Sequence, residues 1–121
     1  MAYDNPTTIT YHVEAATVSG AATLLRGVGP AGKQGRLVDI GFVTTTATTV
    51  AATELRVGTV ADPDAYGILS VPIQIAAVVT NGATSYTTIS NLIPANTYFA
   101  LASDGASTAG AGTIILTIDW F

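Results

Sequence analysis

The sequence contains no cysteine, so neither disulfide bonds nor thiolate metal sites can contribute to its stability. Charge is also scarce, because Asp, Glu, Lys and Arg make up 10% of the 121 residues, whereas about 25% is usual in soluble proteins. The surface must therefore consist largely of Thr, Ser, Gly and Ala. Such a surface can be buried against a neighbour without desolvating many ions, which favours a subunit of an assembly over a free monomer.

Positive charge is particularly rare. The basic residues are Arg26, Lys33, Arg36 and Arg56, and the net charge is −4. These are too few to neutralise a row of phosphates, so we expect no nucleic-acid partner. No apolar run approaches the ~18 residues of a membrane span, and the polar start MAYDNPTT lacks the charged and apolar regions of a signal peptide. We therefore expect no membrane partner, and synthesis in the cytoplasm.

The pattern of apolar residues predicts an all-β fold. The sequence shows no amphipathic helical pattern. It is dominated instead by β-branched residues, in runs separated by Gly, Pro, Asn and Asp. The strongest alternation is in TIILTIDW, where Ile114, Leu116, Ile118 and Trp120 share one face, and it predicts a central core strand. About eight antiparallel strands with short turns predict a β-sandwich with a jelly-roll-like topology.

Two domain-level segments follow from the composition. Residues 1–10 contain Pro6 and little apolar material, which predicts an extended N-terminal arm that becomes ordered on a partner. Residues 11–121 form the predicted sandwich. Within it, Pro72 predicts an edge or a bulge, because proline cannot donate to a ladder. Asn81-Gly82 lies between two strand-like runs and predicts a type I′ hairpin.

The loop GVGPAGKQG resembles two phosphate-binding motifs in its glycine spacing. Gly27, Gly29 and Gly32 satisfy G-x-G-x-x-G, and Gly27 to Lys33 nearly satisfies the phosphate loop. Gln34 occupies the position of the magnesium-binding hydroxyl, and a strand follows where both motifs need a helix. An inter-strand loop is therefore favoured over a nucleotide site. A third interpretation is a basic loop, with Lys33 beside Arg26 and Arg36, that docks on an acidic neighbour.

Asp62 and Asp64 flank Pro63 and are weak candidates for a metal site. Two carboxylates could supply one corner of a calcium site, completed by Asp104 or by backbone carbonyls. The same residues are ordinary turn formers, because Asp caps a turn and Pro pre-sets its bend. We therefore favour a corner between two strands, with Tyr66 folding back onto the rim of the sandwich.

No catalytic residue is predicted, and the protein is not expected to be an enzyme or to need a cofactor. His12 is the one histidine, and the sequence has neither a G-x-S-x-G elbow nor a second imidazole for a metal. Trp120 could form a platform for a sugar ring, but its place in the alternating strand favours the core.

Three features together resemble one family. They are the polar start MAYDNPTTIT, the Thr- and Ala-rich body, and the segment VAATELRVGTVADPDAYGILSVPI. With these features, the chain is similar to the small head decoration, or cement, proteins of tailed bacteriophages. The resemblance implies a jelly-roll-like sandwich, commonly a homotrimer, on the outer capsid surface of the virion. There it would bind between subunits of the major capsid protein and stabilise the shell.

The arm and the basic loop are the segments that we expect to bind the capsid. The predicted capsid-binding residues are Tyr3, Asp4, Asn5, Pro6, Arg26, Lys33 and Arg36. The alternative function is a phage tail or fibre module that binds host carbohydrate, which would need exposed aromatic side chains converging on one patch.

Overall fold

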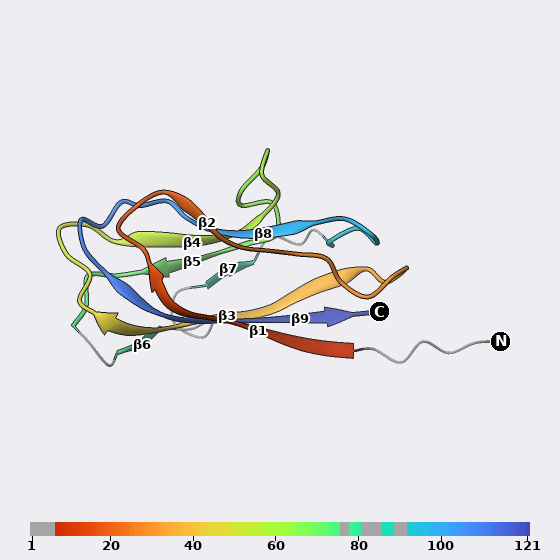
Figure 1. The fold of residues 1–121 in the computed structure, drawn as a ribbon, viewed down its shortest axis with the longest axis horizontal. Coiled ribbons are helices and arrows are strands. Elements are labelled where there is room, and N and C mark those ends of the chain that lie inside the picture. The colour runs from red at the N-terminus through yellow and green to blue at the C-terminus, as the bar shows by residue number, and fades with distance from the viewer. Residues whose placement is uncertain (1–6, 76–77, 81–85, 89–91) are drawn as a thin grey trace.

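A computed structural model describes residues 7–75, 78–80, 86–88 and 92–121, which form two antiparallel sheets packed face to face (Figure 1). The first sheet contains, in spatial order, β1 (Thr7–Thr17), β9 (Ala111–Trp120), β3 (Gly35–Thr46) and β6 (Val79–Thr80). The second contains β2 (Ala22–Gly27), β8 (Phe99–Ser103), β4 (Thr53–Gly58), β5 (Gly67–Val71) and β7 (Tyr86–Thr88). Among the described residues, no helix is long and apolar enough to cross a membrane.

The strand order is that of a jelly roll. β1, β9, β3 and β6 lie in one sheet, and β2, β8, β4 and β5 lie in the same positions of the other. The chain therefore passes repeatedly from one sheet to the other, as in the double Greek key of a jelly roll. β7 is an addition at the edge beyond β5. The predicted all-β sandwich with jelly-roll-like topology is confirmed.

The core lies between the sheets and follows the alternation of each strand. In β9, Ile114, Leu116 and Ile118 are completely buried, and the residues between them are partly exposed. Leu55 and Val57 of β4 face them from the second sheet and are also completely buried. Each fully buried Leu, Ile or Val side chain stabilises the fold by about 1.5–3 kcal/mol. β9 is the predicted central strand, since it pairs with both β1 and β3.

The position of Trp120 explains why glycine occupies two positions of the loop GVGPAGKQG. Its ring is buried and lies against the backbone at Gly29 and Gly35, where an added Cβ would overlap the indole. An ideal Cβ at Gly27 would lie 2.8 Å from the ring of Phe99. The phenyl ring of Phe99 in turn lies 6.0 Å from the indole, between ring centroids. Gly27, Gly29 and Gly35 therefore allow close packing over an aromatic cluster, whereas Gly32 has nothing within 4 Å of an ideal Cβ and instead adopts a φ of +75°.

Hydrogen bonds fix the middle and the end of the same loop. Gln34 and Phe121 exchange two backbone hydrogen bonds of 2.9 Å, and the amide of Lys33 donates to the carbonyl of Pro30 at 3.1 Å. The amide of Gly32 donates to Oδ1 of Asn96 at 2.9 Å. The loop connects β2 directly to β3, as the sequence predicts.

Three local predictions have different outcomes. β1 begins at Thr7, so residues 7–10, assigned to the arm from sequence, belong to the sandwich and pair with β9. β5 ends at Val71, directly before Pro72, so the structure has a strand end where the sequence predicts an edge or a bulge. The hairpin prediction at Asn81-Gly82 falls on residues outside the described part of the chain. The strands described on either side of that segment belong to opposite sheets, β6 pairing with β3 and β7 with β5.

Candidate functional site

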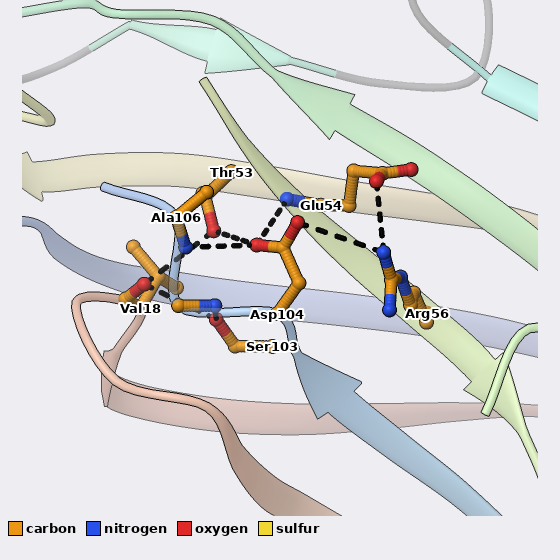
Figure 2. A network of polar contacts seen from close by, with 8 residues as sticks. Val18, Thr53, Glu54, Arg56, Ser103, Asp104 and Ala106 are labelled. Carbon is orange, nitrogen blue, oxygen red and sulfur yellow. Dashed lines mark hydrogen bonds and ion pairs between the residues drawn. The ribbon is translucent and has the colours of Figure 1, made fainter. Parts of the chain in front are cut away.

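A polar network joins the start of β4 to the end of β8 (Figure 2). Oδ1 of Asp104 accepts hydrogen bonds from Oγ1 of Thr53 at 2.8 Å, from the amide of Glu54 at 3.0 Å and from the amide of Ala106 at 3.1 Å. The amide of Asp104 donates to the carbonyl of Glu54 at 3.1 Å. One carboxylate thus accepts hydrogen bonds from backbone amides at the start of β4 and in the turn that follows β8.

Arg56 balances the charge of this network. Its Nη2 lies 3.0 Å from Oε1 of Glu54 and 3.7 Å from Oδ2 of Asp104. Burial by itself would raise the pKa of Asp104, but the hydrogen bonds from Glu54, Ala106 and Thr53, with the charge of Arg56, lower it below its ordinary value. The hydrogen bond to Glu54 raises the pKa of Arg56. A carboxylate held ionised and already bonded to three donors is a structural tie rather than a general base.

Asp62 and Asp64 form the predicted corner between two strands. Backbone amides of Thr59 and Ala65 donate to the carbonyl of Asp62 at 2.9 and 3.2 Å. A hydrogen bond with Asp64, together with slight desolvation and the repulsion of its charge, raises the pKa of the Asp62 carboxyl. Tyr66 then folds back and is buried, as expected.

The suggestion that Asp104 completes a metal site with these carboxylates is wrong. Asp104 bonds at the start of β4, whereas the Asp62 turn follows the other end of that strand, after Gly58. The carboxylate of Asp104 is also committed to Thr53 and to Glu54. Within the part of the chain that the structure describes, no group of three or more His, Asp or Glu side chains could hold a metal ion.

The predicted basic residues are brought to one end of the sandwich, which we call the arm end. Arg36 lies at the start of β3 and Lys33 in the loop before it. Nζ of Lys33 donates to Oγ1 of Thr7, the first described residue after the arm, at 3.4 Å. Arg26 lies near the end of β2 at this end of the molecule, where β1 starts and the C-terminus lies (Figure 1). Tyr3, Asp4, Asn5 and Pro6 lie outside the described residues.

Aromatic rings accompany the cations at the arm end. The guanidinium carbon of Arg26 lies 5.8 Å from the ring centroid of Tyr98, and that of Arg36 lies 5.8 Å from the ring centroid of Phe121. Tyr98 is 61% exposed and Phe121 is 43% exposed. Both pairs fit cation–π contacts, which contribute about 0.5–1 kcal/mol at exposed sites. The rings also hold each guanidinium in a defined place on the surface.

The electrostatics of the arm end are mixed. Nη2 of Arg36 lies 3.8 Å from Oδ2 of Asp119, and its side chain remains 65% exposed. Exposed ion pairs of this length contribute little to stability. The arm end therefore offers cations, rings and exposed apolar side chains together; its exposed members are Arg26, Val28, Arg36, Leu92, Tyr98 and Phe121.

His12 and Trp120 lie where the favoured interpretations place them. His12 is exposed on the outward side of β1. Trp120 is 1% exposed, and its Nε1 donates to the hydroxyl of Tyr11 at 3.2 Å. Burial raises the pKa of Tyr11, and the bond from Trp120 offsets this only in part. The buried indole presents no face on which a sugar could stack.

Sequence reasoning missed the aromatic members of the arm end. Tyr98 and Phe121 lie far from Arg26 and Arg36 in sequence, and they meet them because β8 pairs with β2 and β9 pairs with β3. Only the strand order brings these residues together. The sequence signal that could have found them was an aromatic residue at one end of each predicted strand, Tyr98 at a start and Phe121 at an end.

Comparisons with known proteins do not assign the chain to a family. No protein-family model matches the chain, and no curated protein matches it. Among solved structures, the chain is similar to a chain of the structure of infectious bursal disease virus Gx strain, with a TM-score of 0.42 and 11% sequence identity. That match covers 96% of this chain and 32% of the viral chain.

Proposed function

We propose that this protein is a virion structural protein that decorates the outer surface of a bacteriophage capsid. In this role it binds the major capsid protein through its arm end and the N-terminal residues that precede Thr7, and it stabilises the shell. The low charge of the sequence and its resemblance to head decoration proteins support the proposal. The jelly-roll sandwich is a rigid body on which such a surface can be carried.

The observation that carries the proposal is the convergence at the arm end. Arg26, Lys33 and Arg36 come from three different segments, and the fold gathers them around the start of β1. Arginine and aromatic side chains are enriched in protein interfaces because they combine contact area with directed polar groups. The N-terminal residues that precede Thr7 would add contacts to such a surface without enlarging the folded body.

Binding to capsids that lack the protein tests the proposal directly. Purified protein is mixed with heads from virions grown without the gene, and bound protein is measured after sedimentation. We expect wild-type protein to saturate the heads. The triple variant R26Q/K33Q/R36Q should bind at least about tenfold more weakly, because charge complementarity and the two ring contacts are lost. Deletion of residues 1–6 should also abolish stable attachment.

A matched control separates local contacts from net charge. The variant T46E/A52E/A106E changes the net charge by the same amount as the triple Gln variant, but its three exposed positions lie at the opposite end of the sandwich. It should bind like wild type. Equal binding by the wild type, the Gln variant and the deletion would refute the arm end as the attachment surface.

A further inference from the structure

The four edge strands of the sandwich are not equally protected against pairing with another chain. An edge strand presents unpaired N–H and C=O groups, and proteins usually protect it by shortness, charge, proline or bulges. As far as the structure describes them, β6 has two residues and β7 three. β2 has six residues, a register shift between Thr23 and Leu25, and Arg26. Each of these edges is short or interrupted.

β1 is the exception. It has 11 residues and lies at the outer edge of its sheet, paired on one side with β9. Its pairing with β9 is regular from Thr7 to Val13 and shifts register only after that point. The stretch TTITYHV contains no proline, lysine, arginine or acidic residue. In the part of the chain that the structure describes, it is therefore a regularly paired, uncharged seven-residue edge, with Lys33 bonded to the side chain of Thr7 at one end.

The side chains of this stretch point to the same conclusion. Ile9, Tyr11 and Val13 face inward and pack against the core, but each is only partly buried. The residues opposite them in β9, such as Leu116 and Ile118, are completely buried. The flank of the core beside β1 is therefore incompletely covered, and one more strand at this edge would complete its burial.

We propose that β1 pairs antiparallel with β1 of a second copy of this chain, centred on Thr10. A two-fold axis at Thr10 uses the whole regular stretch. It places Thr10 opposite Thr10, Ile9 opposite Tyr11, and Thr8 opposite His12. Apolar residues then meet on the inner face and polar residues on the outer face. The pairing adds roughly six to eight backbone hydrogen bonds and joins two four-stranded sheets into one.

The second copy fits this edge better than a charged partner strand. The stretch has no net charge to be complemented, and two copies bring no like charges together in the proposed register. A two-fold axis at Thr10 also matches the faces of the two copies. The inward side chains, Ile9, Tyr11 and Val13, meet inward side chains, and the outward ones, Thr8, Thr10 and His12, meet outward ones. The resulting assembly is two-fold, which differs from the homotrimer that the family resemblance implies. The proposal is independent of capsid attachment.

Light scattering on the purified full chain tests the proposal. We expect a particle of twice the 12.3 kDa chain mass at micromolar concentration. Thr10→Lys should raise the dissociation constant at least about tenfold, because it places two ammonium groups opposite each other at the axis. Thr17→Lys changes an exposed threonine of the same strand beyond the register shift and should leave the dimer intact. Circular dichroism should show both variants folded.

Cysteine cross-linking tests the register. Because the chain has no cysteine, Thr10→Cys should give a single disulfide-linked dimer on oxidation, since directly opposed residues lie within bridging distance, ~4.5–5.5 Å between Cα atoms. On a denaturing gel without reducing agent, Thr17→Cys should run as a monomer, because no disulfide links its two chains. A wild-type monomer, a trimer, or a dimer insensitive to Thr10→Lys would overturn the proposal. So would the absence of cross-linking in Thr10→Cys.

Discussion

At the scale of single residues, contacts between distant positions decide what the local pattern means. The spacing of Gly27, Gly29 and Gly32 resembles a nucleotide motif, and its missing helix and hydroxyl could be recognised from sequence. The actual need for glycine at positions 29 and 35 could not be, because it arises from the ring of Trp120 at the far end of the chain. The sequence therefore excludes a nucleotide site in this loop, but it does not show which side chain packs against its glycines.

Substitution of Gly35 should therefore be costly. An ideal Cβ at Gly35 would lie 2.6 Å from Cζ3 of Trp120, and the ring is held by its bond to Tyr11. We expect Gly35→Ala to reduce the free energy of unfolding by about 1–3 kcal/mol, as overpacked cores do. Gly20→Ala is the control, since nothing lies within 4 Å of its Cβ. Denaturant titration should show unchanged stability for Gly20→Ala, and equal midpoints for both variants would contradict the packing.

Asp104 should make stability depend on pH in the acid range. The folded state holds its pKa below the ordinary value, so its stabilising contribution is complete above the unfolded-state pKa of about 3.9 and is lost as the pH falls through the folded-state pKa. Asp104→Asn should lower stability at neutral pH by about 1–3 kcal/mol, because charge-assisted bonds to Thr53 and Glu54 are weakened.

The same variant should unfold with a flatter pH dependence below pH ~5, measured by urea titration at several pH values. Glu14→Gln provides the control, because it removes an exposed carboxylate from β1. It should keep the pH dependence of wild type. If Asp104→Asn still lost stability steeply as the pH fell, another titrating group would be responsible for that loss.

At the scale of elements, the alternation of apolar residues was a good guide to strands and a poor guide to their partners. The pattern from Ile114 to Trp120 identified β9 as central. Pro72 was predicted to mark an edge or a bulge, and it follows the end of β5 instead. The sequence did not show that β6 and β7 belong to opposite sheets, because local patterns say nothing about which sheet a short strand joins. Pairing in a jelly roll is decided by long-range burial.

The start of β1 gives a prediction at this scale. Deletion of residues 1–6 removes nothing that pairs with β9, whereas deletion of residues 1–10 removes four ladder positions opposite Thr117 to Trp120 and the side chain of Ile9. We expect the shorter deletion to melt close to wild type. The longer one should lose about 2–4 kcal/mol through lost hydrogen bonds and apolar burial. Equal melting temperatures would place residues 7–10 outside the folded body.

At the scale of the whole molecule, the two ends of the sandwich differ in chemistry. The arm end combines arginines, carboxylates and rings, whereas the described loops of the opposite end, before β4 and after β5, expose Val50, Ile73 and Ile75. The sequence analysis grouped Arg26, Lys33 and Arg36 around one basic loop. It could not predict that Tyr98 and Phe121 join them, because that contact follows from the pairing of β8 with β2 and of β9 with β3.

The central position of β9 also has a consequence for biosynthesis. Tyr11 and Trp120 touch across 109 residues of sequence, so β1 leaves the ribosome long before the strand that it pairs with exists. At about 5–20 residues per second, that delay is on the order of 5–20 s. During this interval the nascent chain carries an unpaired, threonine-rich segment, and polysomes would bring many such segments close together. Co-translational association of neighbouring nascent chains is therefore a hazard, or an opportunity, that this topology creates.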